Sequence, residues 1–134
     1  MKTVFVDSNV VLDVLLKNEG FWQDSLKIFR FAELGLVHAH ASASSMTDIF
    51  YIVRKRLSSP VARESIEKLL NLFAIVSVDG DDLRSALALT IDDMEDALQA
   101  WCAIKINADA LITRDVDGFT NINIPVITPA DFMA

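Results

Sequence analysis

Short apolar runs alternate with longer helical stretches along the whole chain, and this alternation constrains the fold more than any other feature. The runs are rich in β-branched residues, which is typical of strands buried on both faces. They lie at residues 3–6, 36–40, 74–78, 110–113 and 126–127. The stretches between them carry apolar residues at helical spacing, at residues 21–34, 45–57, 60–73, 81–89 and 93–106. Strands that alternate with helices predict an α/β fold in which right-handed crossovers build a parallel sheet covered by helices.

Residues at the predicted helix ends agree with this division. Ser59 followed by Pro60 predicts an N-cap with proline at the first helical position. Asp92 and Glu95 have the spacing of a capping box, and Glu95 also favours the positive end of the helix dipole.

Length and composition bound the class of protein. The 134 residues are 52% hydrophobic, which is ample for one core, so we expect a single domain over residues 1–134. The apolar stretches are too short to span a membrane, and no signal-peptide region precedes Asp7, which predicts a cytoplasmic protein. A net charge of -7 argues against binding to a phosphate backbone unless acidic residues converge on metal ions and local cations guide the strand.

Several kinds of site have little support in the sequence. Cys102 is the only cysteine and lies in a helical stretch, which indicates a core residue and no disulfide. His38 and His40 fall within a predicted strand, where a structural role is the simpler interpretation. With only 4 glycines, the chain has no glycine-rich loop for binding a nucleotide.

Two aspartates follow predicted strands and mark where a ligand site is expected. Asp7 directly follows the strand at 3–6, and Asp115 follows the strand at 110–113 after one residue. In open parallel sheets, ligands bind beyond the carboxyl ends of the strands, where the strand order changes direction. One such aspartate is commonly a helix cap, but the pair indicates a shared acidic site.

Two further aspartates begin apolar stripes on predicted helices. Asp96 shares its face with Ala100 and Ala103, and these small residues allow the helix to lie close to the sheet. Asp48 shares its face with Tyr51 and Ile52, and with Lys55 two turns further on. Both carboxylates are therefore expected to point towards the edge of the core.

The predicted metal-binding and catalytic residues are Asp7, Asp48, Asp96 and Asp115, and Asp93 can reach the same place. Converging carboxylates raise one another's pKa values unless a cation compensates them. No histidine or cysteine joins the group, so a hard ion with oxygen ligands, Mg²⁺ or Mn²⁺, is the fitting cation. Such a site suits phosphodiester hydrolysis, because the metal lowers the pKa of an attacking water.

Four segments resemble the PIN-domain family, and together they span nearly the whole chain. They are residues 6–13 (VDSNVVLD), 95–100 (EDALQA), 108–115 (ADALITRD) and 124–132 (IPVITPADF). The resemblance implies a three-layer, Rossmann-like fold and a Mg²⁺- or Mn²⁺-dependent ribonuclease. For small bacterial members it implies the toxin half of a VapBC-type toxin–antitoxin pair, with RNA as substrate and a small antitoxin protein as partner.

The resemblance carries acidic roles over to Asp7, Asp96 and Asp115. Asp48 stands where family members usually place a glutamate, and its side chain is shorter. The fourth acidic position varies in the family, so Asp117 is an alternative to Asp115 or shares its role.

Three other functions fit parts of this pattern. A phosphatase of the haloacid-dehalogenase type needs a second aspartate two residues after the first, where this chain has Asn9. A DNA-directed nuclease shares the acidic chemistry, although 134 residues leave little room for elements that bend a duplex. A non-catalytic RNA-binding or regulatory module stays open because a fold does not fix a function.

Basic and aromatic residues indicate where partners bind. The only basic run, Arg54 to Arg56, fits a solvated helix end and RNA contact equally well. Aromatic residues exceed the needs of one sheet face, and core packing is the first interpretation; a homodimer contact or a groove for an antitoxin segment are the alternatives. These residues are Phe21, Trp22, Phe29, Phe31, Phe50 and Tyr51.

Overall fold

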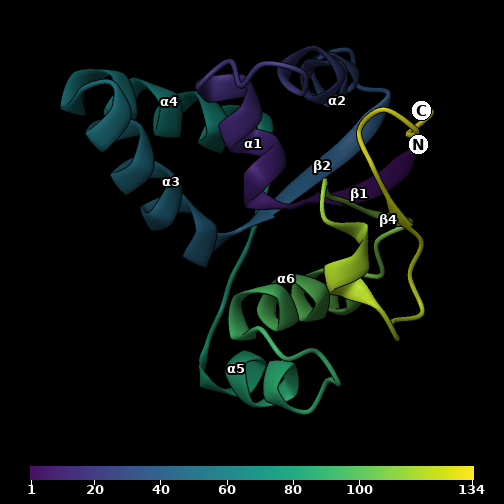
Figure 1. Ribbon diagram of the computed structural model, residues 1–134. Coiled ribbons are helices and arrows are strands. Elements are labelled where there is room, and N and C mark those ends of the chain that lie inside the picture. Colours follow the sequence, from purple (N-terminus) through teal and green to yellow (C-terminus); the bar gives the residue numbers. More distant parts are fainter.

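A sheet of five parallel strands lies at the centre of the protein, whose computed structural model describes residues 1–134 (Figure 1). The strands are β1 (Lys2–Val6), β2 (Val37–Ser42), β3 (Ala74–Val76), β4 (Ala110–Ile112) and β5 (Val126–Ile127). All neighbouring strands pair in parallel. The predicted strands and their parallel arrangement are therefore confirmed.

The strand order β3-β2-β1-β4-β5 places the first strand in the middle of the sheet. The chain adds β2 and β3 on one side of β1 and then returns to the other side for β4 and β5. Val6 is paired with Ile112 at the ends of β1 and β4. Asp7 and Asp115 therefore follow adjacent strands at the point where the strand order reverses, which is where open α/β sheets bind ligands.

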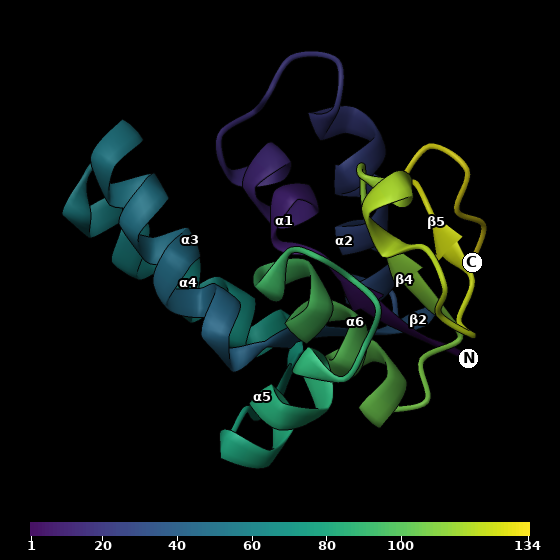
Figure 2. The same cartoon turned by 60° about the horizontal axis from the view of Figure 1, so that its bottom comes forward.

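Helices cover both faces of the sheet and complete three layers (Figures 1 and 2). One layer contains α1 (Ser8–Leu15), α2 (Trp22–Glu33), α3 (Ala43–Arg56) and α4 (Ser59–Leu72). The other contains α5 (Gly80–Leu87) and α6 (Met94–Lys105), and a 3₁₀ turn, η1 (Val116–Phe119), follows β4. Helices α3 and α4 pack side by side and project beyond the sheet (Figure 2). No helix is both long and apolar enough to span a bilayer.

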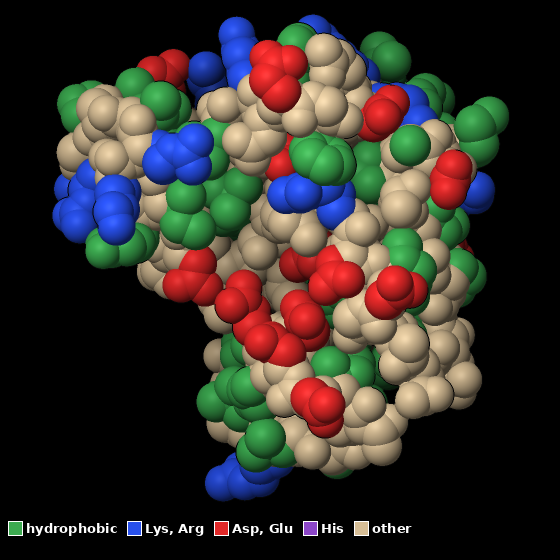
Figure 3. Space-filling view, viewed as in Figure 1, with side chains coloured by type: hydrophobic (Ala, Val, Ile, Leu, Met, Phe, Trp, Pro, Cys, Tyr) green, Lys and Arg blue, Asp and Glu red, His purple; other side chains and the backbone are tan.

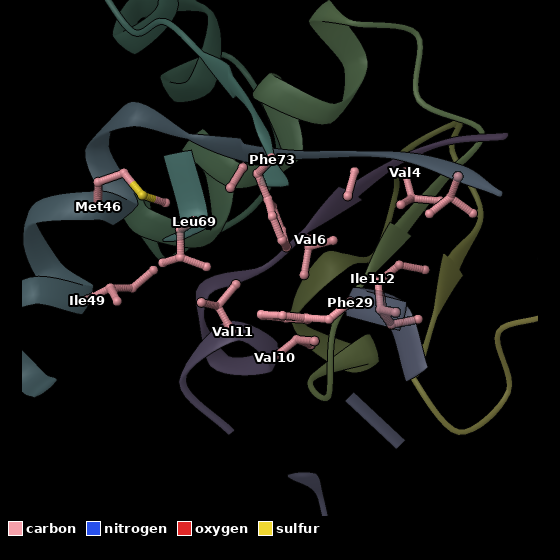
Figure 4. Close-up of a cluster of buried hydrophobic side chains, with 14 of the residues drawn as sticks. Val4, Val6, Val10, Val11, Phe29, Met46, Ile49, Leu69, Phe73 and Ile112 are labelled. Atoms are coloured by element: carbon pink, nitrogen blue, oxygen red, sulfur yellow. The ribbon is translucent and has the colours of Figure 1, made fainter. Parts of the chain in front are cut away.

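Alternate strand residues point into different layers of the core. In β1, Val4 and Val6 pack in the larger hydrophobic cluster, whereas Phe5 between them packs in the smaller one. Figure 4 shows part of the larger cluster, where side chains from β1 and β4 meet those of α1 to α4. Burial on both faces explains why the strands are continuous apolar runs in the sequence.

Helix α1 was not predicted from the sequence. Its apolar residues form an almost unbroken run, so no polar face at helical spacing separates a helix from a strand. Asp7 caps the run, which favours a helix. Val10, Val11 and Asp13 are all buried in this short helix, so that even its polar residue does not mark a solvent-exposed face. The layer that covers this face of the sheet therefore begins directly after the first acidic residue.

Two predicted helix caps are wrong by one residue. The cap of α6 is Asp93 and not Asp92, because the Asp93 side chain accepts a hydrogen bond from the Asp96 amide at 2.9 Å. The cap of α4 is Ser58, so that Ser59 is the first helical residue and Pro60 the second. Serine and aspartate repeat at both places, and spacing alone does not choose between neighbours.

Candidate active site

Asp7 is the most firmly held carboxylate of the predicted site. It is only 5% exposed, and it follows β1 directly and caps α1. Its Oδ1 accepts hydrogen bonds from the Ser8 amide at 2.8 Å and from Gln99 Nε2 at 3.1 Å. Its Oδ2 accepts one from Thr113 Oγ1 at 2.8 Å. These neutral donors compensate the buried carboxylate and fix its orientation.

The Thr113 hydroxyl joins the ends of β1 and β4. Besides donating to Asp7, it accepts the Asp115 amide at 3.0 Å and lies 3.4 Å from Asn9 Nδ2. Thr113 is fully buried. The Thr113 hydroxyl therefore orients the Asp7 carboxylate, whereas Ser8 acts through its backbone amide.

Gln99 is a site residue that the sequence did not predict. It is 2% exposed, and its amide bridges Asp7 to a pair of serines at the start of α3. Its Oε1 accepts hydrogen bonds from Ser42 Oγ at 2.8 Å and from Ser45 Oγ at 3.3 Å. The available signal was its position three residues after Asp96, a polar side chain on the otherwise apolar face of α6.

Asp96 lies in the first turn of α6, and Ala100 and Ala103 on the same helix are buried as predicted. Its pKa is raised from 3.8 to about 6, above all by burial. The other causes are the negative charges of Asp93, Asp7, Asp115 and Glu95. The structure therefore brings Asp96 into the electrostatic reach of Asp7 and Asp115, and Asp93 both caps the helix and adds to the charge.

Gly118 in η1 allows Asp96 and Asp115 to approach each other. A Cβ atom at this position would lie 2.7 Å from Asp115 Oδ2 and 3.3 Å from Asp96 Oδ2. A side chain at residue 118 would therefore displace the Asp115 carboxylate. Asp115 and Asp117 are both exposed, but only Asp115 contributes to the raised pKa of Asp96.

Asp48 is exposed on α3, so its predicted position at the edge of the core is wrong. Tyr51 on the same stripe is 55% exposed, because α3 projects from the sheet and turns this face to solvent. Asp48 instead lines a cleft of about 320 Å³ together with Ser8, Asn9 and Glu95. Burial is the main cause that raises the pKa of Glu95. The negative charge of Asp48 is the next cause, and those of Asp7 and Asp93 add to it. Glu95 thus links Asp48 to the other acids, a role that its assignment to the helix dipole did not include.

These residues fit a hard divalent cation by their chemistry. The donors are all carboxylate oxygens, and Figure 3 shows acidic side chains gathered around a hollow on one face. Burial first, and then the neighbouring carboxylates, raise the pKa values of Asp96 and Glu95, and no cation offsets these effects. No three Asp, Glu, His or Cys side chains lie close enough in the structure to form a ready-made metal cage, and the carboxylates of Asp48 and Asp115 are exposed.

Cys102 takes no part in this site. It is fully buried in α6, and burial raises the pKa of its thiol to about 11. Its prediction as a core residue is confirmed.

The chain is similar to known proteins in sequence and in structure. Ribonuclease VapC1 of Aquifex aeolicus (strain VF5) is 24% identical over 134 residues, which cover 96% of this chain and 92% of that protein. DNA-bound VapBC from Salmonella typhimurium has a TM-score of 0.74 at 15% identity, over 96% of this chain and 99% of that chain. VapC20 of Mycobacterium tuberculosis, a Sarcin-Ricin loop cleaving toxin, has a TM-score of 0.66 at 11% identity, over 81% and 86% of the two chains. The two solved structures share the fold.

The model of one protein family covers most of the sequence. The PIN domain model matches residues 3–117, from the first strand to the start of η1, and so includes the acidic residues described above. The chain therefore belongs to the PIN domain family.

Proposed function

We propose that this protein is a Mg²⁺- or Mn²⁺-dependent endoribonuclease and the toxin of a VapBC-type toxin–antitoxin pair. The observation that carries the proposal is the buried Asp7 carboxylate, which three donors hold beside the crowded acids Asp96 and Asp115. The similarity to Ribonuclease VapC1 over nearly the whole chain supports RNA as the substrate.

Acidic residues and the groups that orient them have different roles in this proposal. Asp7, Asp96 and Asp115 would hold the ion, with Asp48 on the side of the cleft that Glu95 lines. When bound, Mg²⁺ or Mn²⁺ supplies Lewis acidity and charge neutralisation at the scissile phosphate. Thr113 and Gln99 keep the Asp7 carboxylate in one orientation, so that little ordering is needed when the substrate arrives.

RNA cleavage by the purified protein tests the proposal. Asp7→Asn and Asp96→Asn should each lower kcat/KM by at least about 100-fold, because loss of a metal ligand costs no less than loss of a partner that only orients one. Chelation by EDTA should abolish cleavage, and Mg²⁺ or Mn²⁺ should restore it. The control Asp81→Asn, at an exposed acid in α5, should cleave as the wild type does.

The same assay separates the alternatives. Equal cleavage by the wild type and both site variants would indicate a contaminating nuclease and remove these residues from the mechanism. Cleavage of DNA but not RNA would favour a DNA-directed nuclease, and RNA binding without cleavage would favour a non-catalytic module.

We also propose a small antitoxin protein as partner and the cytoplasm as the place of action. Structural neighbours include toxin–antitoxin complexes such as those from Rickettsia felis and Klebsiella pneumoniae, which supports such a partner. Phe21 and Tyr51 are exposed at 44% and 55% and are available for a contact, with an antitoxin or between two copies of the chain. Expression alone should slow growth, and co-expression of the protein from the adjacent reading frame should restore it.

A further inference from the structure

Arg114 is a cation fixed in place beside the acidic site. Its Nε lies 2.7 Å from Oδ2 of Asp13, and its guanidinium carbon lies 4.2 Å from the centre of the Phe21 ring. The Arg114 side chain nevertheless keeps 36% of its surface exposed. Nε and one face of the guanidinium are thus engaged within the protein, and no hydrogen-bond partner within the protein occupies its two terminal amino groups.

The partner of Arg114 is unusual because it is completely buried. Asp13 on α1 has no exposed surface, and its other oxygen accepts a hydrogen bond from Asn18 Nδ2 at 2.8 Å. Burying a carboxylate is costly unless it is paired. The chain carries 19 acidic residues against 12 basic ones, so cations are scarce. The contact with Asp13 fixes the orientation of one of them, the Arg114 side chain.

Arg114 lies close to the acidic residues along the chain and in the fold. It stands between Thr113, which donates to Asp7, and Asp115. Asp13 lies six residues after Asp7 on α1, which is about 9 Å along a helix. On the face in Figure 3 a small group of Lys or Arg atoms borders the acidic hollow. Arg114 also lines a cavity of about 240 Å³ between α2 and the segment after β5.

We infer that Arg114 binds a phosphate of the RNA strand next to the phosphate held at the acidic site, an inference that rests on the proposed function. Phosphates repeat every few ångströms along a strand, so a substrate seated at Asp7 presents another one nearby. The two terminal amino groups of Arg114 offer paired N–H donors, which match the oxygens of a phosphate. Because Asp13 and Phe21 already order the side chain, binding costs less conformational entropy than it would for a mobile surface arginine.

The test measures a phosphate contact directly. In an Asp7→Asn background, which prevents cleavage, the protein is titrated into a fluorescein-labelled oligouridylate with Mg²⁺ at several KCl concentrations. Arg114→Gln should weaken binding about tenfold, as expected for a charged hydrogen bond, and should reduce the slope of log K against log salt by about 0.7. Arg114→Lys should keep most of the slope, because the charge remains. Arg84→Gln, an exposed arginine in α5, should change neither quantity.

Two further variants control for a folding defect and test the direction in which a nearby charge changes RNA binding. Asp13→Asn combined with Arg114→Gln removes the buried carboxylate as well, and it should show the same loss of slope as Arg114→Gln alone. Asp24 lines the same cavity as Arg114, so that Asp24→Asn should tighten binding. In the cleavage-competent protein, Arg114→Gln should raise KM more than it lowers kcat, since the contact is made equally in the ground and transition states.

Failure of this inference differs from failure of the proposed function. Cleavage of RNA by the wild type, with an affinity and salt slope unchanged by Arg114→Gln, would overturn the phosphate contact and leave the nuclease intact. A protein that neither binds oligouridylate nor cleaves RNA would overturn both.

Discussion

Two neighbouring helices carry the same acidic motif at their start, yet the two motifs have opposite electrostatics. In α5 the Asp79 side chain accepts the Asp82 amide at 3.0 Å, and in α6 the Asp93 side chain accepts the Asp96 amide at 2.9 Å. Asp82 and Asp96 are each the third residue of their helix. The pKa of Asp82 lies well below its ordinary value, whereas that of Asp96 is raised to about 6.

The difference comes from what the fold brings opposite each carboxylate. Asp82 accepts hydrogen bonds from Trp101 Nε1 at 2.9 Å, the Asp79 amide at 3.0 Å and Lys105 Nζ at 3.0 Å, and these lower its pKa in that order of importance. Asp96 is partly buried and is surrounded by other carboxylates, and both of these raise its pKa. Asp82 therefore stabilises the contact between α5 and α6, while the environment of Asp96 leaves charge for a cation to neutralise.

The largest expected effect that separates the two is on stability without metal. Asp82→Ala should lower the melting temperature by several degrees, since it leaves Trp101 without its acceptor and removes one of the two acceptors of Lys105. Asp96→Asn should raise it slightly, since it removes a charge from a crowded group. Thermal unfolding in EDTA, followed by circular dichroism, measures both.

Asp81→Ala is the matched control for this comparison. Asp81 precedes Asp82 but is exposed and paired only with Arg84 on the surface, where an ion pair contributes little. If the Asp82→Ala and Asp81→Ala variants have the same melting temperature, the network around Asp82 does not stabilise the protein. If Asp96→Asn melts below the wild type, the carboxylates around Asp96 do not repel one another in the folded state.

The sequence predicted those parts of the fold that depend on local patterns. Hydrophobic periodicity identified the five strands and five of the six helices, and the strand ends located Asp7 and Asp115. Helix α1 escaped because a short helix buried among other elements has no polar face to mark its period. Asp48 was placed wrongly because the direction in which α3 leaves the sheet is a tertiary property.

Partners that lie far apart along the chain were beyond local patterns. Gln99 lies 92 residues from Asp7, and Arg114 lies about as far from Asp13. The first contact depends on the packing of α6 against β1, and the second on the strand order that places β4 beside β1. The carboxylates at the site were therefore predictable from chemistry, whereas the groups that orient them required the structure.

A smaller effect distinguishes the two acids through metal binding. Mn²⁺ at a hundredfold excess over its Kd should stabilise the wild type by about 2.7 kcal/mol, which is a rise of several degrees in melting temperature. Asp96→Asn should show a reduced response, and Asp82→Asn should show the full response from a lower starting point. Equal responses in all three proteins would mean that Mn²⁺ binds elsewhere on the acidic surface.

The smallest expected effect is the pH dependence of stability in the metal-free protein. The folded-state pKa of Asp96 is raised from 3.8 to about 6, so the native state binds the proton more tightly than the unfolded state does. The carboxylate therefore costs no stability below pH 3.8, costs progressively more as the pH rises to about 6, and costs a constant amount above it. Asp96→Asn should be more stable than the wild type at neutral pH, with an advantage that disappears on acidification through this window. Solvent screening of the partly exposed Asp96 carboxylate keeps the difference small.

Asp82 has a lowered pKa, so its stabilising contribution is present above pH 3.8 and is lost only as the pH falls further, towards its folded-state value. Urea unfolding in EDTA across this range should therefore give difference curves of opposite sign for the Asn variants at these two positions. Curves of the same sign would show that the shared helix-start motif, and not the surroundings, determines how each carboxylate affects stability.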